Sequence, residues 1–118
     1  MNNRKVGELS EDWAAVYLEQ NGVRIIERNY RFHRMGEIDL IGTDGEYLVF
    51  FEVKYRKTAS AGYAAEAVNY KKIKQICKIA DYYRMVKRIP PDTSIRFDII
   101  AMDGKEIKWI KNAFCYAL

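Results

Sequence analysis

The sequence has two cysteines, one histidine and no long hydrophobic run. Cys77 and Cys115 lack CxxC spacing and a His-rich neighbour, which argues against a disulfide framework and against a structural zinc site. Since His33 is the only histidine and no glycine-rich phosphate loop is present, Ser/His/Asp and Cys/His catalytic schemes are not expected. The longest apolar stretch, around residues 47–51, is far shorter than the ~20 residues that span a bilayer. Because residues 1–12 lack the apolar core of a signal peptide, we expect a cytoplasmic protein that does not bind membranes.

The composition is that of a folded protein with a mild positive charge. The chain has 118 residues, of which 49% are hydrophobic and 31% charged. Because this length buries one core and is short for two, we predict a single domain over residues 1–118. Twenty Lys and Arg against sixteen Asp and Glu give a net charge of +4, which permits a polyanionic partner without requiring one. Many of the basic residues are interleaved with tyrosines, a pattern that suits phosphate and base contacts, although each alone is more often a solvated charge.

The spacing of hydrophobic residues predicts the element order αβββαββ. A first helix over residues 6–21 has Leu9, Trp13, Val16 and Tyr17 at helical spacing, and Gly22 can end it in a left-handed conformation. A strand follows at residues 23–32, and residues 36–56 form a β-hairpin with its turn at Asp44-Gly45.

A link at residues 57–62 leads to a second helix over residues 64–87, which Pro90-Pro91 should end. Its apolar face consists of Ile73, Ile76, Cys77, Ala80 and Tyr83. The last two strands are predicted at residues 94–102 and 107–114.

The hairpin, GEIDLIGTDGEYLVFFEVKYR, contains charges inside an otherwise apolar segment. A turn centred on Asp44-Gly45 predicts that Glu37 lies opposite Glu52, and Asp39 opposite Phe50. Because side chains alternate along a strand, Glu37 and Asp39 should share a face with Glu52 and Lys54. The opposite face is apolar and is predicted to face the core, with Ile38, Leu40, Val49, Phe51 and Val53.

The charged face has two interpretations. An isolated E-x-K in a strand is most often a solvated ion pair. Here Ile41, Leu48 and Phe50 share the face, which favours a covered sheet with a polar notch at one end. Cross-strand neighbours stand ~5 Å apart and diagonal ones ~7–8 Å, so Asp39 and Glu52 bracket a gap that one hard cation could fill. Such a notch suits metal-assisted hydrolysis of a phosphodiester, with the nearby lysine offsetting charge that builds up on the phosphate.

These residues carry a resemblance. Asp39, Glu52 and Lys54 form D-x(12)-E-x-K, which resembles the motif of the PD-(D/E)XK nuclease superfamily, whose αβββαβ core also matches the predicted order. Over nearly the whole chain, GELSEDWAAVYLEQNGVRIIERNYR, GEIDLI, EVKYR and RFDII resemble the small bacterial YraN-like family, which is described as similar to Holliday junction resolvases. Two departures stand out: Ile38 replaces the common proline, and Gln75 is followed by Ile79 in place of the tyrosine of Q-x-x-x-Y.

The resemblance implies a restriction-endonuclease-like fold, with a mixed central sheet flanked by helices. It implies that Asp39 and Glu52 are metal ligands and that Lys54 is the catalytic lysine. It also implies that Glu8 on the first helix reaches the metal or its waters, although a first-turn acid is equally well explained by the helix dipole. Glu37, on the same predicted face as Asp39, is a further candidate ligand.

The leading function is a nuclease, most simply an endonuclease, that uses Mg²⁺ or Mn²⁺ to cleave structured or single-stranded DNA. Lys71, Lys74 and Lys78 share one helix face and, with Arg56, are the candidate DNA-binding residues. One alternative is a nucleic-acid-binding or assembly module of nuclease fold with weak or partner-dependent catalysis, and another is a purely structural oligomer. Because resolvase-like enzymes tend to be dimers, a homodimer is consistent with the resemblance.

Overall fold

Two helices and five strands make up the computed structural model, which describes residues 3–56 and 69–116. In chain order they are α1 (Asn3–Gln20), β1 (Arg24–Arg31), β2 (Glu37–Asp44), β3 (Tyr47–Arg56), α2 (Tyr70–Val86), β4 (Ile95–Asp103) and β5 (Glu106–Phe114). The predicted order αβββαββ is therefore confirmed. The predicted link at residues 57–62 and the start of the second predicted helix, residues 64–68, lie outside the described residues.

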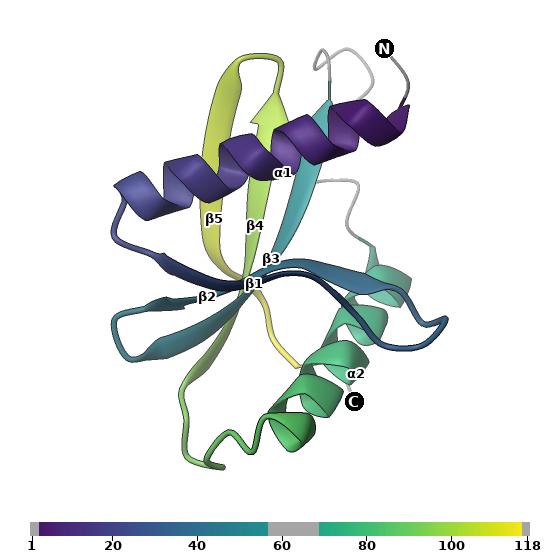
Figure 1. Cartoon of the computed structure of the whole chain (residues 1–118), viewed down its shortest axis with the longest axis vertical. Coiled ribbons are helices and arrows are strands. Elements are labelled where there is room, and N and C mark those ends of the chain that lie inside the picture. The colour runs from purple at the N-terminus through teal and green to yellow at the C-terminus, as the bar shows by residue number, and fades with distance from the viewer. Residues whose placement is uncertain (1–2, 57–68, 117–118) are drawn as a thin grey trace.

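The strands form one mixed sheet in the order β1-β2-β3-β4-β5. Its two central strands, β3 and β4, are parallel, and all other neighbours are antiparallel. Parallel neighbours need a long connection, and α2 lies in that crossover. The sheet is strongly twisted, so that β1 and β2 run across the direction of β4 and β5 (Figure 1). The predicted α/β class, with helices flanking a mixed sheet, is confirmed, and it is consistent with a restriction-endonuclease-like core.

The helix α1 presents mostly small residues to the sheet, and several of its large residues face outward. Its buried face consists of Ser10, Ala14, Ala15 and Leu18. Leu9, Trp13 and Val16, which define the helical spacing in the sequence, are about half exposed at 48%, 48% and 51%. The periodicity thus predicted the helix but not the face that it buries. The helix is followed by Gly22 at φ +90°, in the left-handed conformation predicted for it.

The helix α2 packs on the other face of the sheet. All five residues of its predicted apolar face pack in the core cluster that includes Phe50 and Phe97. Asn69 caps its first turn by accepting a hydrogen bond from the Lys72 N–H at 3.0 Å. The helix ends at Val86, and Arg88 then adopts φ +54°, so the chain leaves the helix before the proline pair. Among the described residues, neither helix is long and apolar enough to cross a membrane.

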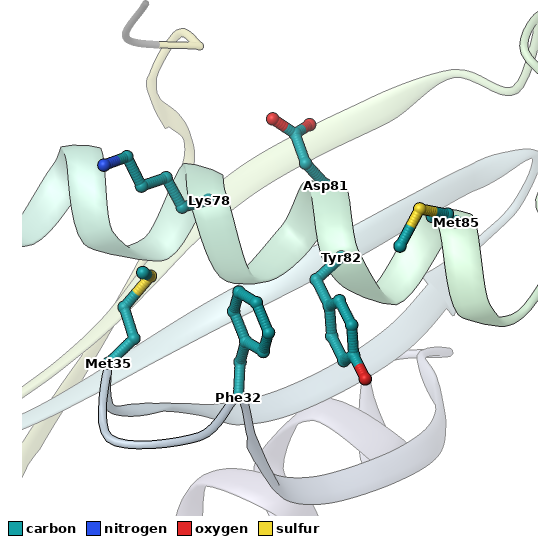
Figure 2. A pocket seen from close by; sticks show the side chains of 6 residues that line it. All are labelled: Phe32, Met35, Lys78, Asp81, Tyr82 and Met85. Carbon is teal, nitrogen blue, oxygen red and sulfur yellow. The ribbon is translucent and has the colours of Figure 1, made fainter.

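A stacked pair of rings joins α2 to the turn between β1 and β2. Phe32 lies at the end of β1, and its ring centroid is 3.9 Å from that of Tyr82, with an angle of 11° between the planes (Figure 2). Such a stack adds a specific contact to the apolar packing of the helix. It fixes the β1–β2 turn against the middle of α2.

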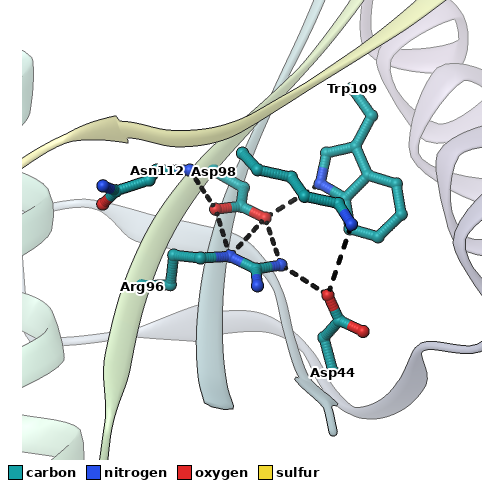
Figure 3. Close-up of polar contacts among 6 residues, drawn as sticks. Asp44, Arg96, Asp98, Trp109 and Asn112 are labelled. Atoms are coloured by element: carbon teal, nitrogen blue, oxygen red, sulfur yellow. Dashed lines mark hydrogen bonds and ion pairs between the residues drawn. The ribbon is translucent and has the colours of Figure 1, made fainter.

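A fully buried acid, Asp98 on β4, organises the other end of the sheet (Figure 3). Its two oxygens accept hydrogen bonds from the Arg96 guanidinium at 2.9–3.1 Å, from the Trp109 indole N–H at 2.8 Å and from the Asn112 backbone N–H at 2.8 Å. Arg96 also donates to Asp44, at the end of β2, at 2.7 Å. The network therefore joins β2, β4 and β5, and every donor around Asp98 points at an acceptor.

Replacing Asp98 by asparagine should destabilise the protein. The asparagine amide would bring an NH₂ group to a site where every neighbour is a donor, and Arg96 would lose a buried counter-charge. We expect Asp98→Asn to lower the free energy of unfolding by about 3 kcal/mol. Urea denaturation measures this, with Asp92→Asn at an exposed turn position as the control. Equal stability of the two variants would contradict this role of the network.

Candidate active site

The hairpin pairs in a register shifted by two residues from the prediction. Asp44 pairs with Tyr47 and Leu40 with Phe51, so the turn consists of Gly45 and Glu46 instead of Asp44 and Gly45. The predicted pairs Glu37 with Glu52 and Asp39 with Phe50 are therefore wrong. A shift of two keeps each side chain on its face, since the strand period is also two. Continued by one step beyond Leu40 and Phe51, the observed register brings Asp39 beside Glu52.

The alternation of side chains along β2 is interrupted at Asp39. Leu40 packs in the α1 core cluster, as predicted, together with Val49, Phe51 and Val53. Ile38, predicted on the same face, packs instead in the α2 cluster. Across from Asp39 on β1, Asn29 has φ +53°, an irregular conformation within a strand. At this point Asp39 comes near both Glu11 of α1 and Lys72 of α2.

Asp39 is held at the place where β2 and β3 separate. Its Oδ2 accepts a hydrogen bond from the Val53 backbone N–H at 2.8 Å. Leu40 and Phe51 are the last paired residues before this point, so the carboxylate takes a position beyond the regular ladder. The bond fixes the Asp39 side chain between the strands that carry the other acids.

Glu52 lies in the centre of the sheet and is only 4% exposed. Two ammonium groups approach it: Lys54 Nζ lies 3.7 Å from Oε1, and Lys72 Nζ of α2 lies 3.8 Å from Oε2. These are ion-pair distances longer than a hydrogen bond. Among the described residues, Oε2 has no hydrogen-bond partner. A buried carboxylate oxygen in this state is costly unless something else pairs with it.

Asp39 also belongs to a group of three carboxylates, with Glu11 of α1 and Glu37 of β2. Glu11, Glu37 and Asp39 each place an oxygen within 4.8 Å of the others, the one such group found among the described residues. Glu37 also lies 3.4 Å from the Arg31 guanidinium. Asp39 therefore belongs both to this group and to the pair with Glu52.

Burial and mutual repulsion raise the pKa of Glu11, Asp39 and Glu52. Burial raises the pKa of Glu52 to about 8, and the neighbouring Asp39 contributes to the increase. Burial raises the pKa of Glu11 to about 7, with further contributions from Asp39 and Glu37. The pKa of Asp39 is also raised, chiefly by burial and also by Glu37. Clusters of acids with raised pKa values are typical of functional sites.

The cluster has the donor set of a site for a hard divalent cation. Such ions prefer carboxylate oxygens, and a cation would both reduce the repulsion and pair with the Glu52 oxygen that has no hydrogen-bond partner among the described residues. Asp39 is placed to bind it together with Glu52 or with Glu11 and Glu37. The residues present thus fit a cation such as Mg²⁺ or Mn²⁺.

The structure brings together most of the residues singled out in the sequence. Asp39, Glu52 and Lys54 meet at the separation of β2 and β3, and Glu37 lies beside Asp39. Glu8 is exposed one turn before Glu11 and does not belong to the three-acid group. Lys71, Lys74 and Lys78 line one shallow depression on α2. Arg56 ends β3, where its carbonyl accepts a hydrogen bond from the Gly104 N–H at 2.7 Å.

Sequence reasoning missed Glu11 and Lys72. Glu11 could have been found, because it stands three, four and seven residues before the small or buried residues Ala14, Ala15 and Leu18, on the face that α1 turns to the sheet. Lys72 carried no such signal. Its approach to Glu52 depends on how α2 docks after the crossover.

Comparison with known proteins places these residues in a family. Residues 10–102 match the family described as "Uncharacterised protein family UPF0102". A UPF0102 protein of Lachnoclostridium phytofermentans is 45% identical over 114 residues, which cover 97% of this chain and 96% of the relative. UPF0102 proteins of Shewanella loihica and Fusobacterium nucleatum are each 44% identical, covering 92% and 95% of this chain and 92% of each relative.

The raised pKa values predict that stability falls with rising pH. Glu52 binds its proton more tightly in the folded protein than in the unfolded chain, where its pKa is near 4.5. Its contribution to the free energy of unfolding therefore decreases from about pH 4.5 to about pH 8. Since Glu52→Gln removes this titration, the variant should become increasingly more stable than the wild type across that range.

Urea denaturation in EDTA across this pH range measures the effect. Glu46→Gln, at the exposed hairpin turn, is the matched control and should follow the wild type. A constant difference between Glu52→Gln and the wild type would contradict the prediction.

Proposed function

The chain belongs to the uncharacterised protein family UPF0102, and from that premise and the acidic cluster we propose that it is a divalent-metal-dependent nuclease of the PD-(D/E)XK superfamily. The proposed substrate is DNA in structured or single-stranded form, and the proposed cofactor is Mg²⁺ or Mn²⁺. The proposed place of action is the cytoplasm.

One observation carries the proposal: a buried carboxylate, Glu52, with an oxygen that has no hydrogen-bond partner among the described residues, lies beside a second, partly buried carboxylate, Asp39. Proteins rarely bury two neighbouring acids without a function, because each raises the cost of ionising the other. A structural pair would be expected to have its oxygens saturated by donors, as Asp98 is. The pair of Asp39 and Glu52 lacks such a full set of donors among the described residues, which suits it to bind a cation.

A divalent cation held by Asp39 and Glu52 would polarise a phosphate and lower the pKa of a water molecule. Glu11 and Glu37 are the further carboxylates that could hold it or its waters. The chain's own contribution includes the Lys54 ammonium, which lies 3.7 Å from Glu52 and can offset negative charge that develops on the phosphate oxygens. Hydrolysis then joins the water oxygen to phosphorus, breaks one phosphorus–oxygen ester bond and leaves a proton on the departing oxygen.

Lys72 is a second cation at the same acid. At 3.8 Å from Glu52 Oε2, it partly neutralises the carboxylate that a divalent cation would bind. A cation with higher charge would displace this contact and free the ammonium for a phosphate. Lys72 thereby extends the predicted set of Asp39, Glu52 and Lys54.

The same two lysines favour a second candidate function. Because Glu52 already has two ammonium groups within 4.0 Å, the site is partly balanced without a divalent ion. This is the arrangement expected of a nucleic-acid-binding or assembly module that kept the fold with weak or partner-dependent catalysis. Cleavage that depends on Mg²⁺ or Mn²⁺ distinguishes the two functions.

Asp39→Asn and Glu52→Gln should each abolish metal-dependent cleavage without unfolding the protein. Each change keeps the size of the side chain and removes a charged ligand, so we expect a loss of about 100-fold or more in rate. The measurement uses single-stranded, duplex, flap and four-way-junction DNAs with each metal. Glu46→Gln is the control for a lost surface charge. Wild-type activity in both variants would contradict the assignment of Asp39 and Glu52 to the active site.

Lys54→Ala should separate rate from affinity. Loss of an ammonium that acts on the reacting phosphate should lower the rate by about 100-fold. Binding should weaken by less than about 10-fold, since one phosphate contact among several contributes little to affinity. Single-turnover cleavage measures the rate, and anisotropy with Ca²⁺ in place of Mg²⁺ measures binding. Lys108→Ala, at an exposed position on β5, is the control, and parallel losses of rate and affinity would make Lys54 a binding residue.

A further inference from the structure

A groove lies between α2 and the turn that joins β1 to β2 (Figure 2). Its volume is about 320 Å³. The lining is mainly aromatic and thioether: Phe32, Met35, Tyr82 and Met85, with Lys78 and Asp81 from the same helix. The rings of Phe32 and Tyr82 are stacked on each other in its lining, and Met85 is 69% exposed. One exposed and three partly exposed large side chains therefore line a place shaped to hold a ligand.

A second depression of about 290 Å³ adjoins this groove and is basic. It is lined by Met35, Lys71, Lys74, Gln75 and Lys78, and it shares Met35 and Lys78 with the groove. In Figure 2, Lys78 extends toward the N-terminal end of α2, the end on which Lys71 and Lys74 stand. The helix thus presents a continuous path from three ammonium groups to an aromatic groove.

The basic depression also adjoins the candidate active site. Gln75, in its lining, packs so closely on Gly36 that a Cβ at that position would lie 2.7 Å from Gln75 Nε2. Glu37 of the acidic group follows Gly36 directly, and Lys72 of the same helix turn reaches Glu52. The acidic site, the basic depression and the aromatic groove therefore lie one after another alongside α2.

We propose that the groove holds the base of an unpaired nucleotide, in a single strand whose phosphates lie on Lys71, Lys74 and Lys78. The inference rests on the proposed function for its choice of partner, and it names the form of substrate: a strand with at least one unstacked base, separated from the scissile phosphate by the phosphates that lie on the three lysines.

The chemistry of the lining favours this occupant. Aromatic rings hold bases of any sequence by stacking, and thioether sulfur adapts to flat, polarizable surfaces. A base within a duplex is stacked on its neighbours and is not free to enter a side groove. A second copy of this chain is disfavoured, because a two-fold contact through this face would bring the same lysines toward one another. A polyanion with planar apolar groups complements both halves of the path.

Two neighbouring variants test the groove. Met85→Glu adds an acid at its exposed end, whereas Val86→Glu adds the same charge one residue away, at a 48% exposed position outside the lining. Affinity for a labelled single-stranded oligonucleotide is measured by anisotropy in EDTA, with DNA and RNA in separate arms. We expect Met85→Glu to weaken binding about 5- to 100-fold, the range that stacking of one base provides, and Val86→Glu to weaken it far less.

A second pair of variants tests stacking itself. Tyr82→Ala should weaken single-strand binding, and Tyr82→Phe, which keeps the ring, should restore it. The fluorescence of 2-aminopurine placed at successive positions of the strand should change at one position with the wild type and with Tyr82→Phe, but not with Tyr82→Ala. Trp13→Ala, an exposed aromatic on the opposite side of the sheet, should leave both signals unchanged. Thermal melting confirms that each variant is folded.

These outcomes separate the groove from the proposed active site. Equal effects of Met85→Glu and Val86→Glu, or equal affinity of the wild type for single strands and duplex, would overturn the groove and leave metal-dependent cleavage untouched. Self-association of the wild type that Met85→Glu abolishes would overturn it too, in favour of a second copy. Because binding is measured in EDTA, absence of cleavage with all metals would refute the nuclease and not the groove.

Discussion

The repulsion between two neighbouring carboxylates, the buried Glu52 and the partly buried Asp39, is the constraint around which the rest of the site is arranged. Their ionised forms repel and are poorly solvated, so the fold must supply compensation. It does so with three groups from two elements: the Val53 N–H and Lys54 on β3, and Lys72 on α2. The sheet and the crossover helix therefore both stabilise the ionised forms of these two acids.

The two kinds of buried acid in this fold differ in how completely they are paired. Asp98 is fully buried, and each of its oxygens accepts hydrogen bonds from side-chain or backbone donors. Glu52 is nearly as buried but keeps an oxygen with no such partner among the described residues. The first arrangement is rigid and complete, whereas the second is left open to a further cation. The difference distinguishes an acid that supports the sheet from one that is available for chemistry.

The sequence was sufficient for the elements and for the apolar face of α2, but not for the face that α1 buries or for the mutual placement of the elements. The hairpin register was wrong by two residues, yet Asp39 still comes beside Glu52, because the observed register places the two residues opposite each other one step beyond its last pair, Leu40 with Phe51. Local patterns failed where tertiary packing decides. The α1 helix buries the face of Ala14, Ala15 and Leu18 and not that of Leu9, Trp13 and Val16, which placed Glu11 in the acidic group, and the docking of α2 brought in Lys72.

The parallel pairing of β3 with β4 has a consequence for the order in which the protein folds. The β2–β3 hairpin closes through a two-residue turn, whereas pairing Leu48 with Ile95 requires the intervening chain to close a long loop. Local contacts form quickly and distant ones late, since the chain loses loop-closure entropy before the distant contacts that offset this loss can form. We expect Asp39 and Glu52 to meet early, while still hydrated, and to lose their water only when β4 and α2 arrive. Desolvation of the acids would then belong to the last, slowest stage of folding.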